Sequence, residues 1–403
     1  MTVSLKPVSD VKIGVIGLGR TGRKILERMR VRPSWDVDAI CYDCDLEVMG
    51  VSNPWFGCEC LGVGMLHGLG CGGQVELGQS VAFGSEETIR AWLAGKSVVL
   101  MLLGAGGGFS GGFAPEVADW AREMGIPVLC VACMPFSFEG ISRIDSARRA
   151  IDVLRDSSLA VVTVELDDML LWAGDESWAQ PVIELAIDWM QEAASSVLSL
   201  ILEEGLFAFD LTTLRQVFDL GFSKTLFITG EGEGEKAVDD AIQQIMGFAD
   251  FRLPDSEVIV DRMLVSLRGG ASLGVADVNR INQTISKRFR KPARSFFGAT
   301  IEEKESKVTI GVFLSIGLGG GEQASASTPD AAGAGEPESG VAPGARMRAS
   351  KPVSGEKGDA QGYFDVLIRE SNRGVFEDTE PNLVNGEDLD VPTFLRRGIR
   401  IKT

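Results

Sequence analysis

Histidine, basic charge and long apolar runs are all scarce in this chain of 403 residues. Its one histidine, His67, argues against a Ser-His-Asp triad and against a histidine-rich metal site. Lys and Arg number 39 against 57 Asp and Glu, which gives a formal net charge of -18. A chain with that balance is not expected to have a nucleic-acid backbone or an anionic membrane as its main partner.

No apolar run reaches the roughly 18 residues of a membrane-spanning helix, so the sequence predicts no membrane insertion. The first residues, MTVSLKPVSDVKIGVIGLG, lack the basic region, apolar region and cleavage site of a secretory signal. We therefore expect a cytoplasmic protein. With 45% hydrophobic residues, a chain of this length can form two ordinary domains.

The seven cysteines, an odd number, agree with a reducing compartment, where pairing is not needed. Two C-x-x-C spacings, Cys41 with Cys44 and Cys130 with Cys133, could together form a four-thiolate zinc site. Each pair ends an apolar strand pattern, however, where free cysteine is usually a core residue. We therefore favour core cysteines over a metal site. No partner pattern is evident for the other three, Cys58, Cys60 and Cys71.

Short apolar runs alternate with helical patterns in the first part of the chain, which is typical of an α/β fold with a mostly parallel sheet. Helical patterns at 21–30 and 114–125 are examples of the intervening segments. Strands are expected at 11–19, 38–45, 97–104, 126–133 and 159–166.

The rest of the chain divides by composition. A helical pattern over 178–204 is long enough to join two domains, and 205–317 has the helix and strand patterns of a second α/β domain. Residues 318–384 are rich in Gly, Ala, Ser, Glu and Pro, which predicts a disordered linker. The final segment, 385–403, regains apolar residues and is expected to dock on a partner, whereas 1–10 is expected to be flexible.

Three glycine clusters mark places where the chain could hold phosphate. Residues 17–22, GLGRTG, match the dinucleotide pattern G-x-G-x-x-G, and Asp43 ends the next strand, so an NAD-dependent oxidoreductase is one candidate. The other clusters, 68–73 and 104–112, favour a triphosphate surrounded by backbone N–H groups, because a nicotinamide cofactor carries one pyrophosphate. No G-x-x-x-x-G-K-[ST] occurs, which excludes the P-loop class.

Four segments in order, GLGCGGQVELG, LGAGGGFSGGFAPEVADWAREMGIPV, CMPFSFEGISR and DLDVPTFLRR, resemble the FtsZ branch of the tubulin/FtsZ superfamily. The resemblance covers residues 11–317 and the tail. It implies a Rossmann-like GTP-binding domain at 11–177, a central helix at 178–204 and a C-terminal activation domain at 205–317. It also implies a GTPase of bacterial cell division that polymerises head to tail at the division site, with GTP or GDP and Mg²⁺ bound.

By this resemblance the first glycine loop and the signature loop hold the phosphates. The signature of the family has a threonine or serine flanked by glycines, whereas this chain has Phe109 there and a hydroxyl one position later at Ser110. Phosphate binding is therefore expected in an altered form. The nucleotide-binding positions implied are Gly19, Arg20, Thr21, Gly22, Arg23, Lys24, Gly72, Gly73, Gly106, Gly107, Gly108, Phe109, Ser110, Gly111, Gly112, Glu139, Arg143 and Asp188.

The ribose and base contacts are implied in the same way. Glu139 and Arg143 match the pair that contacts the ribose and nearby nucleotide, and the alternative is an exposed ion pair one helical turn apart. The guanine-binding asparagine of the family is Leu166 here, and the Asn-Asp pair is Ile187-Asp188. The Asp188 carboxylate could still accept two hydrogen bonds from guanine, although a solvated helix aspartate is the alternative.

Hydrolysis in the family is completed by a neighbouring subunit through an N-x-D-x-x-D loop. The corresponding residues here are Ala208, Asp210 and Thr213, so one carboxylate is kept and two polar groups are lost. Loss of a positioned base costs about 10²–10⁴-fold in rate, which predicts slow or absent GTP hydrolysis, with Asp210 as the catalytic candidate. By the resemblance, Asp43 and Asp45 align with an Asn-x-Asp pattern of the family and are candidate outer-shell partners of Mg²⁺; alternatively, either one caps the following turn.

The tail resembles the peptide by which the family binds membrane-tethering and regulatory division proteins. The chain could therefore join a filament of its own or mix with another FtsZ, and a non-catalytic partner or regulator of an orthodox FtsZ is the alternative. The partner-binding positions implied are Asp390, Pro392, Phe394, Leu395 and Arg396.

Overall fold

The computed structural model divides into two units, Met1–Gln323 and Ala324–Thr403. In the second unit it describes only two short strands, β11 (Leu383–Val384) and β12 (Glu387–Asp388), which pair in antiparallel fashion. Most of the expected linker and the partner-binding positions of the tail lie outside the described residues. The structure describes residues 11–50, 53–174, 178–203, 205, 210–218, 224–253, 260–270, 273–289, 292, 294–301, 307–316, 383–384 and 387–388.

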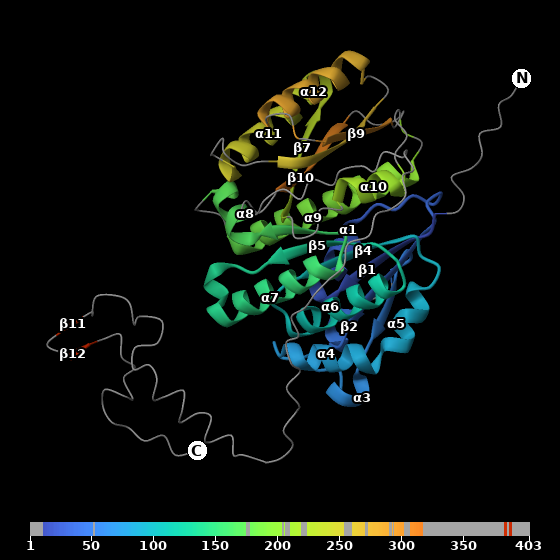
Figure 1. Cartoon of the computed structure of the whole chain (residues 1–403), viewed down its shortest axis with the longest axis vertical. Helices are drawn as coiled ribbons and strands as arrows, with labels where there is room; N and C mark the ends of the chain where they lie inside the picture. The colour runs from blue at the N-terminus through green and yellow to red at the C-terminus, as the bar shows by residue number, and fades with distance from the viewer. Residues whose placement is uncertain are drawn as a thin grey trace, which may run out of the picture. The chain divides into compact units, whose positions relative to one another are not determined.

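The first part of the chain forms a parallel sheet with the order β3-β2-β1-β4-β5-β6. Figure 1 labels β1, β2, β4 and β5 of this sheet. The strand order is that of a doubly wound fold, in which ligands bind outside the carboxyl ends of the strands where the order reverses. That position lies between β1 and β4. The strands are β1 (Ile13–Leu18), β2 (Val37–Asp43), β3 (Gly57–Cys60), β4 (Val98–Gly104), β5 (Val128–Met134) and β6 (Ala160–Glu165).

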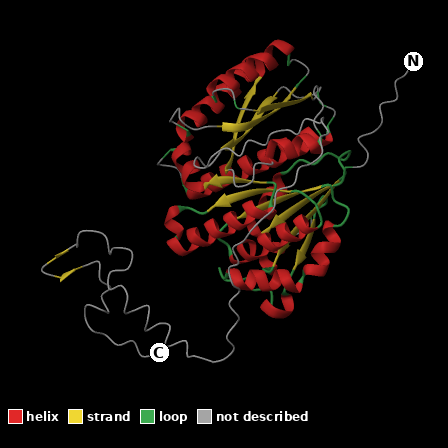
Figure 2. Cartoon of the chain, in the orientation of Figure 1, coloured by secondary structure: helices red, strands yellow, loops and turns green. Residues whose placement is uncertain are grey.

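Helices cover both faces of this sheet (Figure 2), because alternate residues of a strand point to opposite faces. Along β1, Val15 belongs to one apolar core with Ile25, and Ile16 belongs to a second core with Phe113. The helices are α1 (Gly19–Arg28), α2 (Leu46–Met49), α3 (Val63–Leu66), α4 (Val75–Gly84), α5 (Glu86–Leu93), α6 (Gly108–Glu123), α7 (Ile141–Ser157) and α8 (Leu166–Ala173), with a 3-10 turn at Ser137–Glu139.

The long central helix α9 (Ala179–Leu202) was expected over nearly the same residues. It is long and apolar enough to cross a membrane, but 72% of its most apolar window is buried in the protein. Val182, Met190 and Val197 are fully buried in the first of the two apolar cores. This helix is therefore a core helix between the two groups of strands.

The second part of the chain extends the same sheet. Strand β7 pairs with β6 through Val162 and Thr225, and β10 then pairs antiparallel with both β7 and β8. The predicted α/β fold with a second α/β part is thus confirmed, within one ten-stranded sheet. Its elements are α10 (Leu211–Phe218), β7 (Lys224–Glu233), α11 (Ala237–Arg252), β8 (Val260–Gly269), α12 (Val275–Arg288), β9 (Arg294–Ile301) and β10 (Lys307–Ile316), with a 3-10 turn at Gly234–Lys236.

Candidate functional site

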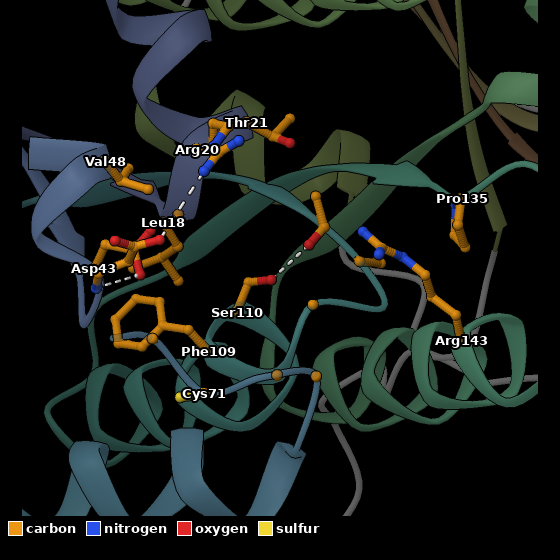
Figure 3. A pocket seen from close by; sticks show the side chains of 18 of the residues that line it. Leu18, Arg20, Thr21, Asp43, Val48, Cys71, Phe109, Ser110, Pro135 and Arg143 are labelled. Carbon is orange, nitrogen blue, oxygen red and sulfur yellow. Dashed lines mark hydrogen bonds and ion pairs between the residues drawn. The ribbon is translucent and has the colours of Figure 1, made fainter. Parts of the chain in front are cut away.

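A cleft of about 490 Å³ opens at the carboxyl ends of the parallel strands (Figure 3). Its walls come from the segments that follow β1, β2, β4 and β5, together with residues 69–73 of a glycine-rich loop. Arg20 and Thr21 of α1 lie on one side, and Phe109 and Ser110 of α6 lie opposite them. The cleft therefore stands at the position where the doubly wound topology predicts a ligand.

Two helix N-termini meet at this cleft. Helix α1 begins at Gly19 directly after β1, and α6 begins at Gly108 shortly after β4. No side-chain hydrogen bond caps either N-terminus. The first backbone N–H groups of each helix, with the positive end of its dipole, are therefore available to an anion. Among the described residues that line the cleft, the cationic side chains are Arg20 and Arg143, and none is a lysine.

The glycine loop that forms the third wall has a backbone that few other residues could adopt. Gly68, Gly70, Gly72 and Gly73 have φ angles of 75°, 76°, 55° and 85°, in the left-handed region. The loop also packs directly on α6, since a Cβ atom on Gly108 would lie 2.6 Å from the backbone nitrogen of Gln74. Glycine is therefore required here both for the turn and for the close contact.

Acidic side chains line the cleft after β2. The Oδ1 atom of Asp43 accepts hydrogen bonds from the backbone N–H groups of Cys44 at 2.7 Å and Asp45 at 3.2 Å. Burial raises the pKa of the Asp43 carboxyl. The two hydrogen bonds lower this pKa, but the effect of burial is larger. Asp45 caps α2 by accepting from the N–H of Glu47 at 2.9 Å, and its carboxylate lies 3.9 Å from the Arg20 guanidinium. Both carboxylates thus stabilise the local turn and still face the cleft.

The two unusual residues of the signature loop are both buried. The Phe109 ring stacks on Phe113 with the centroids 4.7 Å apart and lines the cleft (Figure 3). The Ser110 hydroxyl donates to the carbonyl oxygen of Gly104 at 2.5 Å. A hydroxyl has one proton to donate, so in this rotamer Ser110 can only accept from a ligand. The hydrogen-bond donors that this loop can offer to an anion are therefore backbone N–H groups.

Glu139 and Arg143 line the cleft at its other end, next to Pro135. Their side chains form the i,i+4 ion pair, with Nε and Oε2 3.0 Å apart. The second oxygen of Glu139 accepts from the N–H of Phe136 at 2.9 Å. The stem of Arg143 lies against the loop, since a Cβ on Gly106 would be 2.9 Å from the Arg143 Cγ. The pair is thus both an ion pair and part of the cleft wall.

Several of the expected nucleotide-binding residues lie outside the lining of the cleft. The Arg23 side chain turns away to the carbonyl of Met49 and to Glu27, and Lys24 lies 3.6 Å from Glu184. Gly22 is a packing glycine, because a Cβ there would lie 2.5 Å from the Leu102 carbonyl oxygen.

Gly112 has the same packing role on α6. A Cβ on Gly112 would lie 2.1 Å from the carbonyl oxygen of Val75, so this glycine allows α4 to approach the first turns of α6. Gly111 also lies outside the lining, but a Cβ there would make only an ordinary contact with the Val75 side chain at 3.4 Å. The residues that do line the cleft as expected are Gly19, Arg20, Thr21, Gly72, Gly73, Gly107, Gly108, Phe109, Ser110, Glu139 and Arg143.

The expected guanine contacts are separated. Leu166 lines the cleft at the start of α8, whereas Asp188 lines a different hollow beside α9. The Asp188 carboxylate pairs with Arg28, with Oδ1 and Nη1 2.5 Å apart, and Ile187 is a core residue. A role for Asp188 in base recognition stays a prediction.

Asp210, the catalytic candidate, is exposed at the start of α10. Its Oδ1 accepts from the backbone N–H of Thr213 at 2.7 Å, which is a helix N-cap contact and lowers the pKa of the carboxyl. Ala208 lies outside the described residues. Thr213 stands one turn later and carries a hydroxyl where the family pattern has a carboxylate.

Gly104 and Cys71 also line the cleft, although they are not among the binding positions predicted from the sequence. A Cβ on Gly104 would lie 2.6 Å from the Thr21 hydroxyl, and Cys71 lines the cleft beside the Cys44 thiol. Gly104 ends β4 and Cys71 lies in the glycine loop between α3 and α4, and the density of glycines in both places is the signal that could have identified them. Cys41 and Cys130 are buried in strands as expected, and within the described ranges there is no group of three or more His, Cys, Asp or Glu that could hold a metal.

Comparisons with known proteins agree with this geometry. Residues 12–171 match the Tubulin/FtsZ family, GTPase domain. The chain is 27% identical over 400 residues to "Cell division protein FtsZ" of Coxiella burnetii, covering 96% of each chain. It is 26% identical over 303 residues to the protein of that name from Methanothermobacter thermautotrophicus, covering 74% of this chain and 77% of the relative.

Solved structures share the fold. An empty FtsZ dimer from M. jannaschii has a TM-score of 0.67 at 22% identity, covering 76% of this chain and 88% of that one. CetZ2 from Haloferax volcanii, in a protofilament with GTPγS bound, has a TM-score of 0.59 at 18% identity. The match covers 76% of this chain and 94% of that one.

The family match covers the β1 to α8 region that builds the cleft, and its GTPase domain implies guanine-nucleotide binding there. It leaves the oxidoreductase alternative without support, since the glycine loop after β1 belongs to this GTPase pattern. Residues 12–171 are therefore a GTPase domain of the tubulin/FtsZ family, and the chain is a distant relative of FtsZ.

Proposed function

We propose that this protein binds GTP in the cleft and assembles head to tail in bacterial cell division, alone or with another FtsZ. The observation that carries the proposal is the meeting of the α1 and α6 N-termini with the glycine loop at 70–73 in one cleft. The names of the curated relatives, and the dimer and protofilament among the structural relatives, support the division role and self-association. The protein acts in the cytoplasm at the division site.

In this proposal backbone N–H groups hold the phosphates. The first turn of α1 and residues 107–110 face each other across the cleft, and no basic side chain of a P-loop is needed. Arg143 and Glu139 contact the ribose side. Two carboxylates, Asp43 and Asp45, supply oxygen ligands of the kind Mg²⁺ prefers, and the ion when bound neutralises phosphate charge.

Hydrolysis in this proposal is slow. Asp210 is the one carboxylate kept from the catalytic loop, and its hydrogen bond to Thr213 lowers the pKa, which makes it a weaker base. Thr213 supplies no second carboxylate. A neighbouring copy that presented Asp210 to the cleft could orient a water molecule but would activate it poorly.

The tail completes the proposal. Residues 318–384 serve as a linker, and 385–403 bind division proteins that link a filament to the membrane. The domain boundaries proposed for the folded part are 11–177, 178–204 and 205–317.

The test is nucleotide binding and turnover by the purified full chain. We expect GTP to bind and phosphate release to rise more than linearly with protein concentration, because the site is shared between subunits. Arg143→Ala should weaken GTP binding about tenfold through loss of a charged contact. Arg149→Ala, on the same helix and outside the cleft lining, is the matched control. Absence of GTP binding, or an Arg149→Ala effect equal to that of Arg143→Ala, would contradict the proposal.

A second candidate is a non-catalytic partner of an orthodox FtsZ. It is favoured by Phe109, which fills space in the signature loop, and by Asp210, which caps its own helix. Sedimentation with GTP distinguishes the two functions. Pelleting alone supports the first, whereas pelleting only with an orthodox FtsZ supports the second.

A further inference from the structure

Two cysteines from separate segments meet at the wall of the cleft. Cys44 follows β2, and Cys71 lies in the glycine loop, with their sulfur atoms 3.2 Å apart. Cys44 is fully buried and Cys71 is 5% exposed and lines the cleft. We propose that Cys44 and Cys71 form a reversible disulfide, so that the cleft carries a thiol modification site that responds to peroxide.

The backbone already holds these two segments together. The N–H of Gly70 donates to the carbonyl of Cys44 at 3.3 Å, and the N–H of Leu46 donates to the carbonyl of Gly68 at 3.0 Å. Asp45 and Leu69 form an isolated antiparallel bridge between the same segments. The sulfur atoms need to approach by about 1 Å to reach the bond length of about 2.05 Å. A disulfide would therefore form with a small local movement.

The two thiols are suited to different roles. The hydrogen bond to Cys44 lowers the pKa of the Cys71 thiol, whereas the same hydrogen bond and burial raise the pKa of Cys44. The thiolate is the nucleophile in cysteine oxidation, and Cys71 is also the thiol that a small oxidant can reach through the cleft. Cys71 is therefore the attacking thiol and Cys44 the resolving one.

The chemistry balances with hydrogen peroxide as the oxidant. The Cys71 thiolate attacks one peroxide oxygen, so an S–O bond forms, the O–O bond breaks and hydroxide leaves, taking up the thiol proton as water. The Cys44 sulfur then attacks Cys71, so the S–S bond forms, the S–O bond breaks and a second water leaves. A dithiol reductant reverses the reaction by thiol–disulfide exchange.

The disulfide would alter the phosphate end of the cleft, a consequence that rests on the proposed function. The loop that carries Cys71 touches the start of α6 at Gly108, and Cys44 adjoins Asp43. Drawing the loop toward β2 moves it relative to the α6 N-terminus. We expect GTP to bind about tenfold more weakly to the oxidised protein and, by reciprocity, to protect Cys71 from oxidation.

The first test maps the bond in the full chain. Reduced protein is freed of reductant, treated with hydrogen peroxide, alkylated and digested for mass spectrometry. We expect a cross-linked peptide pair containing Cys44 and Cys71, lost after dithiothreitol and absent in Cys44→Ser. Cys60→Ser, which removes a partly buried thiol on neighbouring β3, should leave the cross-link unchanged. Alkylated Cys44 and Cys71 after peroxide treatment, or bonds to other cysteines, would overturn the proposal.

The second test compares GTP affinity before and after oxidation. A loss that dithiothreitol restores, present in wild type and Cys60→Ser but absent in Cys44→Ser, supports the coupling. Equal affinity of the reduced and cross-linked protein shows that the coupling is wrong. Failure of the reduced protein to bind GTP refutes the proposed function but leaves the cross-link measurement intact. If Cys44→Ser does not fold, Cys71→Ser replaces it in the mapping, and wild-type mapping needs no variant.

Discussion

Phe109 lies in the first turn of α6, where its ring both supports the fold and narrows the cleft. It is 6% exposed and stacks on Phe113 within the second apolar core. A threonine in this position would present a hydroxyl to phosphate but would leave part of that space empty. Compared with a threonine, Phe109 thus replaces a hydroxyl that could contact a ligand with apolar packing at the N-terminus of α6.

This packing role predicts a stability effect. Phe109→Ala should lower the free energy of unfolding by about 3 kcal/mol, because a buried ring is lost and a cavity is left. Phe138→Ala is the matched control, since Phe138 also stacks on a phenylalanine, Phe136, at 4.7 Å but is 69% exposed. Its cost should be at most about 1 kcal/mol. Urea unfolding followed by tryptophan fluorescence measures both, and equal costs would contradict the packing role.

Residues of the glycine motif after β1 face different parts of the structure, and the sequence pattern did not show which of them face the cleft. Gly19 and Thr21 line the cleft, whereas Arg23 and Lys24 in the same loop-and-helix motif turn toward other side chains. The motif has a fixed spacing, but a helix turns by about 100° per residue, so neighbouring positions face different directions. The direction of each side chain follows from where α1 packs.

Helices α4 and α6 cross in close contact, and that contact places the α6 N-terminus at the cleft. A Cβ atom on Gly78 would lie 2.2 Å from the carbonyl oxygen of Gly108. Glycines on both helices therefore let the two backbones touch. The sequence predicted the helix over 114–125, whereas α6 begins at Gly108, because glycines disfavour an isolated helix and tertiary packing supplies the missing stability.

The crossing yields a prediction for Gly78→Ala. The added methyl group must separate α4 from α6, so we expect a loss of about 1–3 kcal/mol in unfolding free energy and weaker GTP binding. Gly84 is the last residue of the same helix, and a Cβ atom there would have no other atom within 4 Å. Gly84→Ala should therefore be neutral or stabilise by up to about 1 kcal/mol. Thermal unfolding and GTP titration check this pair, and a neutral Gly78→Ala would show that the contact is not tight.

At the scale of the whole molecule, one sheet links the two α/β parts. The join is narrow, since β7 contacts β6 through Val162 and Thr225, but α9 packs against strands on both sides of it. The Trp189 indole N–H donates to the carbonyl of Phe227 at 3.0 Å and fixes α9 to β7. One apolar core extends from α1 through α9 to β10. Both parts should therefore unfold together.

Deletion of residues 324–403 tests where the stability lies. Both apolar cores and the ten-stranded sheet lie within the first unit, Met1–Gln323, so the shortened chain should keep the urea midpoint and slope of the full chain. It should also keep the proposed GTP binding, while losing the proposed binding of division proteins to residues 385–403. A lower midpoint would show that the second unit stabilises the first.

The alternation of strands and helices, the glycine loops after β1 and β4, the resemblance to FtsZ and the long core helix could all be predicted from the sequence, because each depends on local periodicity or a contiguous motif. The sequence did not predict that Cys44 and Cys71 touch, that Arg23 and Lys24 leave the cleft, or that Asp188 pairs with Arg28. These contacts join segments distant in the chain. Their geometry depends on how helices pack against the sheet, which no local pattern encodes.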